Sequence, residues 1–125
     1  MSINSNARRD TVILMLPSKS HADTAAATSA WFDTASYKGD IIVTHNVGAV
    51  TTSITSKLRS ATSDAGAGAA DITGATFTAC TDADHVESVV VAAMPARYIQ
   101  YVGTVVGGAV LLGVTLRAAT GQATG

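Results

Sequence analysis

The stretch from Arg97 to Arg117 constrains the fold of this chain more than any other. It is the longest and most apolar run in the sequence, R-YIQYVGTVVGGAVLLGVTL-R, with an arginine at each end. Residues 98–116 are about long enough to cross a bilayer as one helix. In that helix Gly103 and Gly107 would form a GxxxG dimerisation face. A β-hairpin is the incompatible alternative, so this stretch decides between a membrane protein and a soluble all-β domain.

The residue types favour the hairpin, with Tyr98–Val106 and Ala109–Leu116 as its strands and Gly107-Gly108 as its turn. Valine, isoleucine, tyrosine and threonine dominate both arms, and these types suit a pleated surface. The arms also alternate, which predicts that Ile99, Tyr101 and Val105 share one face of the first arm. A membrane helix would leave polar residues and four glycines in lipid.

The rest of the chain supplies further strands, separated by turn signals. The predicted strands are Thr11–Leu16, Ala30–Phe32, Asp40–Val47, Ser53–Ser60, Thr76–Ala79 and His85–Ala92. We expect Asp40–Val47 and Ser53–Ser60 to pair as a second hairpin. Ser18–Ser29 and Ala61–Ala70 are predicted loops because small and polar residues dominate them.

This pattern predicts an all-β fold, an antiparallel β-sandwich that is jelly-roll-like. The predicted organisation is an N-terminal arm at residues 1–10, a β-sandwich domain at 11–118 and a C-terminal tail at 119–125. Val12–Leu16 is too short for a secretory signal, so we expect the protein to act inside the cell that makes it.

The composition indicates which partners to expect. Among 125 residues only 14% are charged, and the formal net charge is -1. Such a chain has no electrostatic reason to bind nucleic acid or an acidic membrane. Low charge with many small residues instead predicts an oligomer or a subunit bound to a scaffold.

The sequence offers little catalytic chemistry. Asp82, Asp84 and His85 are the best metal candidates, but they lack the spacing of a known site and are interpreted as a solvated turn. His45 falls on an apolar strand face and is interpreted as a core or interface histidine. Cys80 is the sole cysteine, which excludes an intrachain disulfide. We therefore predict no enzyme, no cofactor and no bound metal.

Several segments occur in a recognisable order along the chain. They are Trp31-Phe-Asp33, Ser36–Val43, Ser53–Ser60, Ala70–Phe77 and Arg97–Val106. Their order resembles that of small virion proteins of tailed bacteriophages. The resemblance implies a capsid decoration, or cement, protein that binds the major capsid protein at the capsid surface. It also implies a homotrimer that is made in the host cytoplasm. No motif separates such a protein from a neck or tail component.

Four residues are predicted to contact partners. Arg8 and Arg9 lie in the polar N-terminal arm and could pair with acidic groups of a capsid protein. His21 lies in the alanine-rich loop that could reach a partner, and Trp31 follows it. The alternative function is a carbohydrate- or receptor-binding virion module, for which an exposed Trp31 would be the natural contact.

Overall fold

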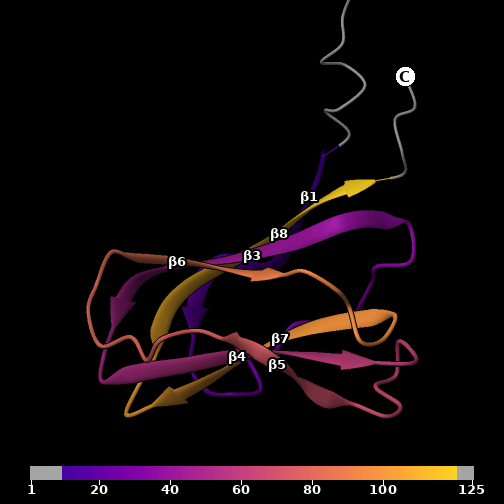
Figure 1. Cartoon of the computed structure of the whole chain (residues 1–125). Helices are drawn as coiled ribbons and strands as arrows, with labels where there is room; N and C mark the ends of the chain where they lie inside the picture. The colour runs from indigo at the N-terminus through magenta and orange to yellow at the C-terminus, as the bar shows by residue number, and fades with distance from the viewer. Residues whose placement is uncertain (1–9, 121–125) are drawn as a thin grey trace, which may run out of the picture.

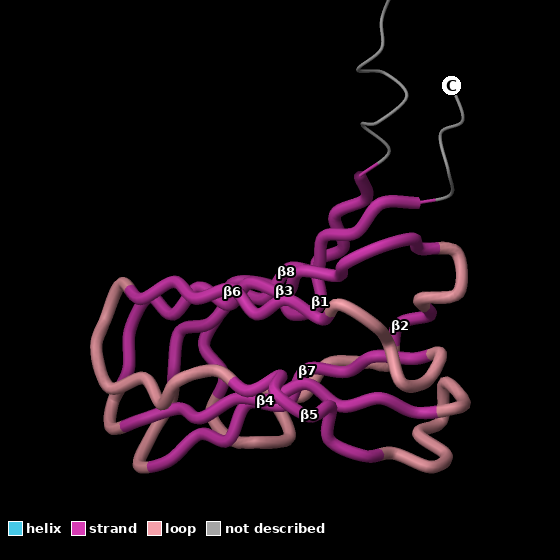
Figure 2. Tube along the Cα trace, viewed as in Figure 1, coloured by secondary structure: helices cyan, strands magenta, loops and turns pink. Residues whose placement is uncertain are grey.

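The computed structural model describes residues 10–120, which contain eight β-strands and no helix (Figures 1 and 2). The described residues therefore include no helix that could span a membrane. The alternative of a membrane helix at 98–116 is wrong, because two strands occupy that stretch. The strands are β1 (Asp10–His21), β2 (Phe32–Asp33), β3 (Tyr37–Val50), β4 (Ser53–Ala61), β5 (Ala70–Thr76), β6 (His85–Val91), β7 (Tyr98–Val106) and β8 (Val110–Thr120).

The strands form two antiparallel four-stranded sheets that lie face to face (Figure 1). One sheet has the order β1-β8-β3-β6 and the other has the order β2-β7-β4-β5. Eight strands in two such sheets are the arrangement of a jelly roll. The predicted all-β, jelly-roll-like sandwich is thus confirmed.

The predicted hairpin of residues 98–116 is wrong in its pairing, although both strands exist. β7 pairs with β4, whereas β8 pairs with β1 and β3 in the opposite sheet. The chain crosses between the sheets at Gly107 and Gly108, whose positive φ angles of 76° and 138° suit glycine. Because the chain crosses between the sheets here, the apolar faces of β7 and β8 can each point toward the opposite sheet. In a flat hairpin the two strands would lie in one sheet and could not face each other in this way.

The predicted second hairpin is wrong for the same reason, because β3 and β4 also belong to different sheets. Their crossing at Thr51 and Thr52 lies beside the crossing of β7 and β8. Thr51 Oγ1 donates a hydrogen bond of 2.9 Å to the carbonyl oxygen of Ala109. β3 pairs with β8 and β4 pairs with β7, so the four strands form one long antiparallel ladder. This ladder bends at both crossings and therefore contributes two strands to each sheet.

β1 extends past the predicted end at Leu16. Register shifts between Leu14 and Leu16, and between Leu16 and Lys19, leave Pro17 outside the ladder of this edge strand. An edge strand tolerates proline at such irregular positions because no ladder hydrogen bond is lost. Ser18–His21 is thus strand and not loop, and β8 runs to Thr120, within the predicted tail.

The core lies between the two sheets, where alternate residues of facing strands meet. Tyr101, Ile54 and Leu58 come from one sheet and are fully buried. Phe77 is also buried, but the strand in this part of the chain is Ala70–Thr76 and not the predicted Thr76–Ala79. Phe77 still lies beside β4, because its N–H donates a hydrogen bond of 2.9 Å to the carbonyl oxygen of Ser56.

Arg97 holds the start of β7 against the end of β2 through a bidentate ion pair. Its Nη2 lies 2.6 Å from Asp33 Oδ2, and its Nε lies 2.9 Å from Oδ1. These two bonds from Arg97, with a third from the Ala35 N–H, lower the pKa of Asp33 from 3.8 to about 2. The pair therefore stabilises the fold above pH 3.8 and is lost as the pH falls toward 2.

We expect Arg97→Met to move the titration midpoint of the Asp33 carboxyl upward from about 2 toward 3.8. The midpoint can be followed by carboxyl carbon NMR between pH 1.5 and 6. Lys57→Met removes a distant cation and should leave the Asp33 midpoint in place. An Asp33 midpoint that does not move in Arg97→Met would contradict the assigned cause.

Candidate functional site

Exposed large hydrophobic side chains gather on one side of the molecule. Within residues 10–120 all except Val106 lie on strands of the β1-β8-β3-β6 sheet. They are Val12, Leu14, Val86, Val90 and Leu111, which are 44–64% exposed. We call the solvent-facing side of this sheet, with these residues, the outer face.

The ladder registers show that the outer face is continuous across all four strands. Directly paired residues of neighbouring strands point to the same side of a sheet. One row consists of Val12, Arg117, Ile42 and Val90, and the next consists of Leu14, Thr115, Thr44 and Ser88. Thr44 and Ser88 share a hydrogen bond of 2.7 Å, which satisfies both hydroxyls without a charge. The face is thus apolar and weakly polar, with the guanidinium of Arg117 on it.

A shallow hollow of about 200 Å³ lies at one end of the outer face, lined by Ser18, Asn46, Gly48, Leu111, Leu112 and Gly113. A side chain at Gly113 would collide with Ser18 Oγ, so this glycine lets β1 lie close over β8.

The opposite sheet presents a different surface. Lys57 Nζ and Arg59 Nε lie 3.1 Å and 3.3 Å from the carboxylate oxygens of Asp71. These residues of β4 and β5 point outward and pair with one another, as solvated surface charges usually do. The exposed large apolar side chains therefore lie mainly on one sheet, and a cluster of paired charges lies on the other.

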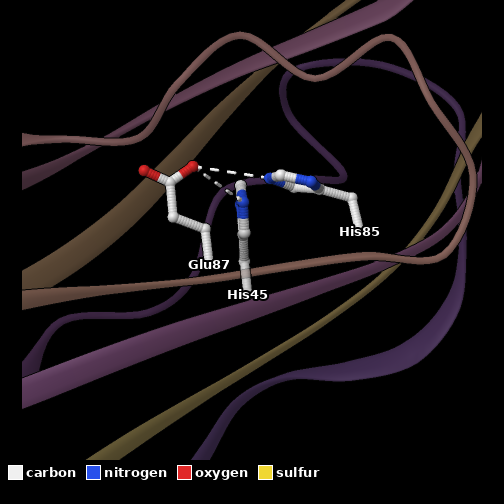
Figure 3. A group of neighbouring side chains, drawn as sticks. All are labelled: His45, His85 and Glu87. Atoms are coloured by element: carbon white, nitrogen blue, oxygen red, sulfur yellow. Dashed lines mark ion pairs between the residues drawn. The ribbon is translucent and has the colours of Figure 1, made fainter.

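A second cluster of functional groups lies on the inner side of β3 and β6 (Figure 3). His45 pairs directly with Glu87 across the two strands, and His85 lies two residues before Glu87. Glu87 Oε1 is 3.6 Å from His85 Nε2 and 4.0 Å from His45 Nε2. Both Nε2 atoms are buried and have no hydrogen-bond partner. The three ligand atoms lie within 4.8 Å of one another, so these residues could hold a metal ion.

The surroundings of His45 determine its protonation. Its ring is fully buried and stacks on Phe77 with centroids 4.2 Å apart. Burial lowers the pKa of His45 to about 4; Glu87 opposes this shift and His85 adds to it.

Tyr101 Oη lies 3.0 Å from His45 Nδ1 and donates to Ser56 Oγ at 2.6 Å. Since the Tyr101 proton goes to Ser56, its oxygen accepts from His45 Nδ1–H, and Nε2 carries the lone pair.

The residues predicted from sequence to bind partners have different positions. His21 is fully buried, and its ring nitrogens face the carbonyl oxygens of Ala26, Pro17 and Leu112. Its burial contradicts the predicted partner contact, because the ring has no surface to offer. Arg8 and Arg9 lie outside the described residues.

Trp31 is half-buried. Its indole lies against the loop between β4 and β5, where a Cβ on Gly66 would be 3.1 Å from Nε1. One edge of the indole is therefore covered by this loop. A partner contact by Trp31 stays a prediction.

The sequence pattern indicates some residues of the outer face and some of the His45, His85 and Glu87 group. It does not show which residues lie together in either. The alternation of β6 places Val86 and Val90 on one face and Val89 and Val91 on the other, and in the structure the first two are exposed and the last two are buried. Apolar residues on both faces of β6 are the sequence feature that could have indicated a covered outer face. His85 was noted with Asp82 and Asp84, which are exposed in the turn before β6. Its actual neighbours, His45 and Glu87, follow from the pairing of β3 with β6.

Comparison with known proteins shows a likeness in fold to a solved structure. No family model matches the sequence, and no curated protein matches it. The structure is similar to the crystal structure of the SPBc2 prophage-derived protein YomS, with a TM-score of 0.50. The likeness covers 87% of this chain and 91% of that chain at 13% sequence identity. At this identity it shows a common fold.

Proposed function

We propose that this chain is a structural protein of a tailed-phage particle, a capsid decoration protein that binds the major capsid protein through its outer face. The contrast between the two sheets carries the proposal. Val12, Leu14 and Val90 are more than half exposed on one side, whereas Lys57, Arg59 and Asp71 pair on the other. A sheet face that exposes several large apolar side chains, opposite a sheet face with paired charges, is the distribution expected of a subunit with one covered side.

Two further observations support a phage particle as the setting. The order of segments from Trp31 to Val106 resembles that of small phage virion proteins, and the fold is similar to a prophage-derived protein. The proposed location is the capsid surface, after synthesis in the host cytoplasm. The proposed role is to stabilise the head by contact, without catalysis and without binding nucleic acid or membrane.

We include in this proposal that the chain forms a homotrimer. Three copies would present three outer faces to the capsid lattice, and linked weak contacts gain avidity without new interactions. Light scattering on the purified protein should then give three times the mass of the 12.6 kDa chain. A mass of 12.6 kDa at every concentration would remove the trimer from the proposal and leave the outer face to act alone.

The function is tested on particles that lack the chain. Phage particles from a strain in which the gene is deleted are expected to release DNA at a lower temperature than the parent particles. Adding the purified chain should restore the parent temperature, and the added chain should sediment with the particles. Equal release temperatures with no co-sedimentation would refute the proposal.

The carbohydrate- or receptor-binding alternative gains no support from the structure. The exposed large hydrophobic residues of the described chain include no aromatic side chain, and Trp31 is half-buried. Sugar-binding surfaces need an accessible ring face, so the described residues favour the capsid-binding proposal over this alternative.

A further inference from the structure

We infer that His45, His85 and Glu87 form a binding site for a divalent transition-metal ion of the zinc class. Two imidazoles and one carboxylate are a common ligand set for Zn²⁺, with a fourth position left for water. The inference rests on three observations: the state of the Nε2 atoms, the groups that orient the ligands, and the place of the cluster in the sheet.

The first observation is the state of the two imidazole Nε2 atoms, of His45 and His85. Both are buried, both lack a hydrogen-bond partner, and both face the same oxygen of Glu87. At 3.6 Å and 4.0 Å neither is close enough for a hydrogen bond to that oxygen. A buried nitrogen without a partner is costly, and a cation between the three atoms would satisfy all of them.

The second observation is that neighbouring residues orient the ligands His45 and Glu87. Tyr101 accepts a hydrogen bond from His45 Nδ1–H, which directs the lone pair of Nε2 toward the cluster. Glu87 is oriented by Thr78, whose N–H donates to Oε1 at 3.0 Å and whose Oγ1 donates to Oε2 at 3.2 Å. Metal-binding histidines and carboxylates are typically held by such outer partners.

The required movement is small. Ligand atoms about 2.0–2.1 Å from a tetrahedral ion are about 3.4 Å apart, and here all three lie within 4.8 Å of one another. The side chains of His85 and Glu87 are 37% and 24% exposed, so they can approach the rigid His45.

The position of the cluster is the third observation and indicates what the ion would do. β6 is an edge strand, and an ion would tie it to β3 at His45. Val86 lies between His85 and Glu87 and points to the outer face. The ion would therefore also fix a residue of the proposed capsid-binding surface, although binding itself does not depend on that function.

The test uses the full chain, freed of metal with a chelator that is then removed. Adding Zn²⁺ to saturation should raise the thermal unfolding midpoint by at least about 5 °C, and Mg²⁺ should not. Co²⁺ should give the intense visible absorption of a tetrahedral site. His85→Ala and Glu87→Gln, both at partly exposed positions, should each weaken Co²⁺ binding at least about tenfold.

Asp82→Asn is the matched control, since it removes an exposed carboxylate from the turn just before β6. It should bind Co²⁺ as the parent chain does. Absence of a Zn²⁺ shift would overturn the inference, and so would equal Co²⁺ binding by the parent, His85→Ala and Glu87→Gln. None of these measurements uses phage particles, so their failure is separate from failure of the proposed function.

Discussion

A chain that carries both Val12→Glu and Val90→Glu is expected to lose at least about 100-fold in affinity for capsids that lack the parent protein. The two residues end one row of the outer face, on the edge strands β1 and β6, and are 64% and 53% exposed. Burying two added carboxylates under an apolar partner surface is costly, whereas in the free chain both remain in water. Co-sedimentation with gene-deleted particles measures the effect.

The control carries the same two charges on the other side of the molecule. Thr55→Glu and Thr73→Glu lie at exposed positions of β4 and β5, in the opposite sheet. This double variant should sediment with particles as the parent chain does. Both double variants should keep the parent free energy of unfolding within about 1 kcal/mol. Equal loss of binding by both would show that net charge and not the outer face determines attachment.

Tyr101→Phe is expected to destabilise the fold by about 2–4 kcal/mol. The Tyr101 side chain is fully buried, and its hydroxyl joins His45 of one sheet to Ser56 of the other. Burial raises the pKa of Tyr101, so this hydroxyl stays protonated and keeps donating. Without it, His45 Nδ1 and Ser56 Oγ both lose a partner in the core. Urea unfolding in the presence of a chelator gives the change without any contribution from metal.

Tyr98→Phe is the matched control for this effect. Tyr98 is half-buried at the start of β7, and Arg97 lies 5.3 Å above the centre of its ring. Removing the Tyr98 hydroxyl keeps that contact, so the free energy of unfolding should change by less than about 0.5 kcal/mol. A Tyr101→Phe change as small as that of Tyr98→Phe would contradict the role given to the buried hydroxyl.

Alternation along the chain predicted where the strands lie and which way their residues point. Ser53–Ser60 and Tyr98–Val106 match β4 and β7 closely, and Ile99 and Tyr101 share one face of β7, which is buried. Alternation does not say which sheet a strand joins. A short connection such as Gly107-Gly108 suits a hairpin and a crossing between sheets equally well, so both predicted hairpins were wrong.

The candidate sites were harder to predict for the same reason. His45 was correctly placed on an inward face, but its neighbours depend on β3 pairing with β6, across the intervening β4 and β5. His21 was expected in a loop because small and polar residues dominate Ser18–Ser29. Register shifts around Pro17 keep β1 intact, and they place His21 in the ladder opposite Val110, with its ring in the core.

The central claim, that this chain decorates a phage capsid through its outer face, is tested most directly by the copy number and position of the chain in purified particles. We expect many copies spread over the capsid lattice, visible by electron cryomicroscopy, with the β1-β8-β3-β6 sheet against the major capsid protein. Absence of the chain from particles would contradict this claim. So would a few copies at the neck or tail, or contact through the charged β2-β7-β4-β5 sheet.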